Sequence, residues 1–139
     1  MSASETAGAR RIRQWFDLSP FNTHLGLRIE RLENDRADVV MPFAASLPTL
    51  GDVVHGGAIS ALADTAATVC SWAGVDDPGD GRGATVALTV EFLAAARGRD
   101  LTATARVLRR GKSLCFSEVD VTEPGGGLVA KALVTYKLG

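Results

Sequence analysis

The sequence lacks the features that would place the protein in a membrane, on nucleic acid or outside the cell. A membrane-spanning helix needs roughly 20 consecutive apolar residues, and the most apolar stretch, residues 58–73, is shorter and interrupted by polar side chains. The net charge is −1, from 15 Lys and Arg against 16 Asp and Glu, so no nucleic-acid partner is expected. The first eight residues contain no apolar segment, which predicts no secretory signal and a cytoplasmic location.

Cysteines and cofactor motifs are also scarce. Cys70 and Cys115 are the only cysteines and lack metal-ligand spacing, so two buried thiols and no metal are expected. No Walker-type loop, dinucleotide fingerprint or Gly-x-Ser-x-Gly motif occurs, and no cofactor is predicted. The 139 residues fit one compact domain, predicted over residues 10–139 after a flexible tail of small and polar residues 1–9.

Hydrophobic periodicity predicts two helices and six strands. Ile12, Trp15 and Phe16 recur at helical spacing, which predicts a short helix from Arg10 that ends before a turn at Pro20. Residues 58–73 are apolar or small on every face, which is typical of a buried helix. Strands are predicted over residues 25–33, 36–43, 84–93, 101–109, 113–123 and 128–138, with a loop over 44–54.

This order of elements predicts an α+β fold, with one long central helix wrapped by a curled antiparallel sheet of five to six strands. In the strand over residues 84–93, simple alternation predicts that one face carries Val86, Leu88, Val90 and Phe92.

Asp64 stands in the middle of the predicted buried helix. Aspartate is a poor helix former there and cannot act as an N-cap, and burying an unpaired carboxylate is costly. The residue pattern leaves two interpretations open. Asp64 is either a structural group bonded to a neighbouring strand or a functional carboxylate.

His55-Gly56-Gly57 precedes the same helix. Glycines allow close approach of a ligand, and free N–H groups at a helix start stabilise an oxyanion; a plain loop-to-helix turn is the alternative. His55 precedes Asp64 by nine residues, about two and a half helical turns. The two residues therefore lie on opposite faces, and a site that uses both requires two chains.

Two basic segments, Arg97-Gly98-Arg99 and residues 109–113, fall in predicted turns. Arg and Lys side chains at such positions either bind phosphate groups or are solvated turn charges, and the sequence allows both.

Residues 55–66 resemble the signature of hotdog-fold acyl-CoA thioesterases of the PaaI-like, phenylacetate-pathway type. The likeness continues through residues 85–93 and 107–113, and it covers roughly residues 15–138. It implies hydrolysis of an acyl-CoA thioester at the interface of a homodimer, with a dimer of dimers expected. Another hotdog activity, such as that of a hydratase, and a non-catalytic acyl-CoA-binding protein are the alternatives.

The same resemblance implies roles for individual residues. Asp64 would be the catalytic carboxylate, as general base or nucleophile, and the Gly56 N–H would polarise the thioester carbonyl. His55 would shape the loop or assist near the thioester, and Thr85 would position the water. Relatives often carry Asn or Gln where this sequence has Thr49. The residues implied in substrate binding are Gly57, Thr49, Arg97, Arg110, Gly111, Lys112 and Ser113. Separately, we expect the pocket to be lined by Leu62, Val69, Trp72, Phe92 and part of the N-terminal segment.

Overall fold

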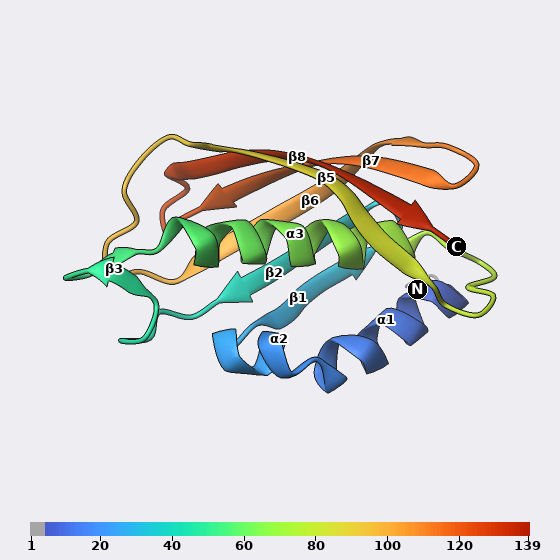
Figure 1. Ribbon diagram of the computed structural model, residues 1–139, viewed down its shortest axis with the longest axis horizontal. Helices are drawn as coiled ribbons and strands as arrows, with labels where there is room; N and C mark the ends of the chain where they lie inside the picture. The colour runs from blue at the N-terminus through green and yellow to red at the C-terminus, as the bar shows by residue number, and fades with distance from the viewer. Residues whose placement is uncertain (1–4) are drawn as a thin grey trace.

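The computed structural model describes residues 5–139. One long helix, α3 (Gly56–Ala73), lies against the concave face of a six-stranded antiparallel sheet (Figure 1). The strand order is β1-β2-β6-β7-β8-β5, which leaves β1 and β5 at the edges. The expected α+β fold is confirmed. The strands are β1 (Arg28–Glu33), β2 (Arg36–Met41), β5 (Gly83–Phe92), β6 (Leu101–Arg110), β7 (Leu114–Thr122) and β8 (Leu128–Leu138).

The core lies between α3 and the sheet, and small side chains form much of it. Ala63, Ala66 and Ala67 of α3 are completely buried, as are Ala103 and Ala105 of β6. Small residues on both sides let the helix approach the sheet closely, so the sheet can curl around it. The largest fully buried side chains are Trp72, Met41, Leu62 and Leu101.

The first helix begins earlier than its apolar periodicity suggests. Helix α1 (Ala7–Leu18) is capped by Thr6, whose side chain accepts a hydrogen bond from the Ala9 N–H. Gly8 and Ala9 are buried, because the start of α1 packs against the end of α3. The flexible tail expected over residues 1–9 is therefore wrong for residues 7–9, and its first four residues lie outside the described ones.

A second short helix replaces the turn expected at Pro20. Helix α2 (Pro20–Leu25) starts there because proline is favoured in the first turn of a helix, and the Ser19 side chain caps it. Gly26, with φ of 69°, ends the helix, so the strand expected from Leu25 begins only at β1. Within the expected loop, two further short strands pair with each other, β3 (Pro48–Leu50) and β4 (Val53–Val54).

Gly8 sits where α1 meets the end of α3. Its N–H donates to the Val75 carbonyl at 2.9 Å, and a Cβ here would overlap the carbonyl oxygens of Trp72 and Val75. We expect Gly8→Ala to lower the free energy of unfolding by about 1–3 kcal/mol, measured by denaturant unfolding. Gln14→Ala, on the exposed side of the same helix, should change it by under about 0.5 kcal/mol. Equal effects would contradict this packing.

Cys70 and Cys115 are free and buried, as expected. Burial raises the pKa of the Cys70 thiol to about 12, so this thiol stays protonated and unreactive at neutral pH.

Among the helices of residues 5–139, none has the length and apolar character needed to cross a bilayer.

Candidate active site

A β-bulge in β5 decides which side chains of this strand face α3. β5 pairs with β8, and the register shifts between Thr85 and Ala87, so Val86 is an extra residue. Thr85 pairs with the buried Tyr136, and Leu88 pairs with a buried valine of β8. Thr85 and Leu88 therefore share the inner face. The expected simple alternation along this strand, which would place Thr85 and Leu88 on opposite faces, is wrong because it ignores the bulge.

The bulge brings Thr85 to Asp64. The Thr85 hydroxyl donates to Asp64 Oδ1 at 2.6 Å. Asp64 Oδ2 accepts no hydrogen bond from the residues that the structure describes. One carboxylate oxygen is thus bonded to a neighbouring strand while the other stays available.

Asp64 is half-buried rather than buried. The expectation that α3 is buried on every face is wrong on this side, where Gly57 is exposed and Ala61, Asp64 and Thr65 are half-covered. The sheet covers one side of α3 and α1 covers its C-terminal end (Figure 1). The remaining stripe of the helix, with Asp64 in it, is open.

His55 caps the start of α3. Its Nδ1 accepts a hydrogen bond from the Gly57 N–H at 2.7 Å, so the helix begins at Gly56, two residues before the expected start at residue 58. The Gly57 N–H is occupied by this cap, whereas the Gly56 N–H has no acceptor in residues 5–139. Next to Gly56 is Phe92, whose ring would lie 3.3 Å from a Cβ at Gly56. Gly56, Phe92 and Thr49 line one cavity with a volume of about 460 Å³.

Asp64 and Gly56 do not meet within one chain. They are eight residues apart on α3, about 12 Å along the helix axis. Asp64 contacts the Thr85 end of β5, while Gly56 contacts the Phe92 end.

Some basic side chains of the two predicted turns are bonded to other residues of the protein, and others are exposed without such a bond in residues 5–139. Arg97 pairs with Asp52 at 3.4 Å near the start of α3, and both side chains are exposed. Arg110 lies near the other end of α3, where it donates to the Ser71 carbonyl at 2.8 Å and to Asp35 at 3.0 Å. Its guanidinium is therefore largely used in holding the structure together.

Lys112 is exposed and forms no ion pair with a residue in the described part of the chain. Its neighbour Gly111 donates to the Leu114 carbonyl at 2.7 Å and closes a tight turn. Gly111, Lys112 and Ser113 line one open cavity. Of the segment 109–113, Lys112 and the exposed Arg109, which lines the same cavity and forms no ion pair in residues 5–139, are the side chains whose charge is available to a ligand.

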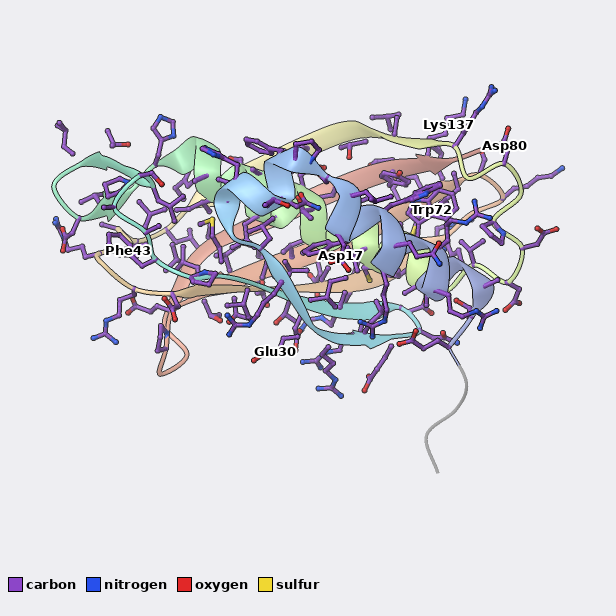
Figure 2. All side chains as sticks on the ribbon, turned by 90° about the horizontal axis from the view of Figure 1, so that it is seen from below. Asp17, Glu30, Phe43, Trp72, Asp80 and Lys137 are labelled. Carbon is purple, nitrogen blue, oxygen red and sulfur yellow. The ribbon has the colours of Figure 1, made fainter. Side chains whose placement is uncertain are left out.

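A third cavity, the α1–α3 cavity, lies between these two helices and β5 and has a volume of about 310 Å³. Val69 and Trp72 line it, as expected, whereas Leu62 is completely buried in the core. Figure 2 shows Trp72 beside α1. Tyr136 also lines the cavity, and sequence reasoning did not name it; the only signal for it is its place in the alternating pattern of the last strand.

The two sheet edges differ in their protection. β1 carries charged residues at both ends, from Arg28 to Glu33, and contains a register shift, features that discourage pairing with another chain. β5 is a ten-residue edge strand on which Val86 and Phe92 are 55% and 53% exposed. The ends of β5 lack the charged residues that in β1 discourage pairing with another chain.

Comparison with known proteins shows similarity to thioesterases. Residues 51–130 match the family model of the thioesterase superfamily. The chain is 30% identical over 135 residues to the medium/long-chain acyl-CoA thioesterase YigI of Escherichia coli K12, covering 86% of each protein. It is 34% identical over 91 residues to acyl-coenzyme A thioesterase 13 of Homo sapiens, covering 62% of this chain and 61% of that protein.

Among solved structures, the PaaI protein from the phenylacetic acid degradation operon of E. coli matches with a TM-score of 0.84 and 25% identity, over 98% of this chain and 96% of that one. The chain therefore belongs to the thioesterase superfamily, as a PaaI-like hotdog thioesterase. Its enzyme class is thioester hydrolase.

Proposed function

We propose that the protein hydrolyses acyl-CoA thioesters without a cofactor, with Asp64 as the catalytic carboxylate. The observation that carries this proposal is the 2.6 Å hydrogen bond from Thr85 to Asp64 Oδ1, which orients the carboxylate on the open stripe of α3. The names of the relatives, which are acyl-CoA thioesterases, support the choice of substrate.

A two-chain site follows from the contacts that the two ends of β5 make with Asp64 and with Gly56. Thr85, near one end of β5, bonds to Asp64, and Phe92, at the other end, contacts Gly56. Antiparallel pairing of two β5 strands about their middle would place Thr85 close to the partner's Phe92. Asp64 would then face the partner's Gly56, and the dimer would hold two equivalent sites.

We propose that the pairing of two such dimers uses the outer face of the sheet. Leu108, Phe116 and Leu133 are exposed large apolar side chains of three neighbouring strands. A group of this kind on a sheet face marks an interaction surface, which supports a dimer of dimers.

In the proposed reaction, the thioester carbonyl oxygen accepts a hydrogen bond from the partner's Gly56 N–H, which stabilises the developing oxyanion. Asp64 takes a proton from water while the water oxygen forms a bond to the carbonyl carbon. The C–S bond then breaks, and the coenzyme A sulfur receives the proton from Asp64. Thr85 holds the carboxylate in position, and the products are the free acid and coenzyme A.

Lys112 is proposed to contact the phosphates of coenzyme A. An exposed charge pair contributes on the order of 0–1 kcal/mol, so Lys112→Ala should raise KM by up to about fivefold and leave kcat nearly unchanged. Lys137→Ala, an exposed lysine on β8, is the matched control and should leave both constants unchanged. A fall in kcat at constant KM would assign Lys112 another role.

The function is tested by following thiol release with a panel of acyl-CoA thioesters, alongside calorimetric binding of the same compounds. Turnover that depends on Asp64 supports hydrolysis. Binding without turnover would instead identify a non-catalytic acyl-CoA-binding protein. The absence of both binding and turnover would overturn the proposal.

A further inference from the structure

The α1–α3 cavity contains a buried polar group whose hydrogen bonding is incomplete. Tyr136 is 6% exposed, and its hydroxyl oxygen accepts a hydrogen bond from Trp72 Nε1 at 3.0 Å. The indole N–H can only donate, so the Tyr136 hydroxyl proton has no acceptor among residues 5–139. Because buried polar groups are normally hydrogen-bonded, a molecule that fills this cavity is expected to supply the acceptor atom.

The position of this hydroxyl is closely defined. The rings of Trp72 and Tyr136 pack edge to face with centroids 6.4 Å apart, and Trp15 packs on Trp72 at 5.7 Å. On the other side, a Cβ at Gly83 would come within 2.5 Å of the hydroxyl oxygen, so only glycine leaves room for it. Burial raises the pKa of Tyr136, and the negative charge of Asp64 adds to this effect while the Trp72 bond opposes it. The phenol therefore keeps its proton and remains a donor.

The donor lies close to the proposed catalytic carboxylate. Tyr136 pairs with Thr85 across the β5–β8 ladder, and Thr85 bonds to Asp64. The cavity extends along α3 from Thr65, next to Asp64, to Trp72, roughly 10 Å along the helix axis. An acyl chain whose thioester carbonyl lies at Asp64 can therefore enter this cavity and pass the Tyr136 hydroxyl.

We propose that Tyr136 is a specificity-determining residue that donates a hydrogen bond to an oxygen atom within the acyl chain of the substrate. The enzyme would then prefer oxygen-containing acyl groups over plain alkyl groups. The physical reason is that a plain alkyl chain fills the cavity but leaves the buried donor unpaired, which is unfavourable. This inference rests on the proposed function and names the class of substrate for it.

The test compares octanoyl-CoA with analogues in which one methylene, at position 4, 5, 6 or 7 of the chain, is replaced by an ether oxygen. Each analogue has nearly the same shape as octanoyl-CoA, and its oxygen can accept a hydrogen bond but not donate one. We expect at least one analogue to be hydrolysed with kcat/KM about tenfold higher than octanoyl-CoA. In Tyr136→Phe we expect this advantage to disappear, because octanoyl-CoA no longer leaves a buried donor unpaired and its kcat/KM rises towards that of the ether analogue.

Trp72→Phe is the matched control, because it breaks the same hydrogen bond but keeps the Tyr136 hydroxyl. We expect it to retain the preference for the ether analogue. The inference is overturned if no analogue exceeds octanoyl-CoA in the wild type, an outcome that needs no variant to fold, or if Tyr136→Phe keeps the preference. Absence of hydrolysis with every thioester would instead overturn the proposed function, and the inference with it.

Discussion

Asp64→Asn is expected to lower kcat/KM for acyl-CoA hydrolysis by about 10²–10⁴-fold, the typical contribution of general base catalysis. Asparagine has nearly the same size and can still accept the Thr85 hydrogen bond through its side-chain carbonyl. It cannot take a proton from water, so the chemistry is lost while the fold is kept. Steady-state thiol release, with circular dichroism and sedimentation to confirm folding and assembly, measures this effect.

Two further variants define what the loss means. Asp17→Asn, at an exposed position on α1, makes the same chemical change away from the site and should leave activity unchanged. Thr85→Ala removes one hydrogen bond from Asp64 and should lower activity by about tenfold or less. Activity like that of the wild type in Asp64→Asn would leave Asp64 as a structural carboxylate bonded to β5.

Mixing two inactive variants is expected to restore activity from near zero. Asp64→Asn lacks the carboxylate, and Gly56→Pro lacks the N–H that polarises the carbonyl. A heterodimer of the two contains one intact site, formed by Asp64 of one chain and Gly56 of the other. Random exchange between equal amounts gives intact sites at about a quarter of the wild-type number. Thiol release after co-refolding, compared with each variant alone, measures the recovery.

The geometry of the helix start makes Gly56→Pro a suitable variant. Gly56 is the first residue of α3, where proline is well tolerated. His55 has φ of −61° and ψ of 135°, a conformation that a residue before proline readily adopts. Gly56→Ala keeps the N–H and adds a similar contact with Phe92, so it is the matched control and should retain most activity. A mixture that stays inactive, with mixed dimers confirmed by mass spectrometry, would contradict the shared site.

The sequence by itself determined the long helix, the six sheet strands and the family. These features are local: α3 and the strands are encoded in runs of apolar side chains with helical or alternating spacing, and the signature over residues 55–66 is contiguous. The sequence also indicated Asp64 as the unusual residue, because a carboxylate in an apolar helix is costly without a partner. It indicated correctly that Cys70 and Cys115 are buried and free.

Only the tertiary structure decided which side chains meet. The bulge at Val86 turns Thr85 toward Asp64, and alternation along the strand cannot reveal a bulge because the register depends on β8. Arg110 looked like a ligand for phosphate but donates to Asp35 and to the end of α3, residues remote from it in sequence. The start of α1, the open stripe of α3 and the hydrogen bond from Trp72 to the Tyr136 hydroxyl likewise depend on contacts between distant segments. Local periodicity contains no information about such contacts.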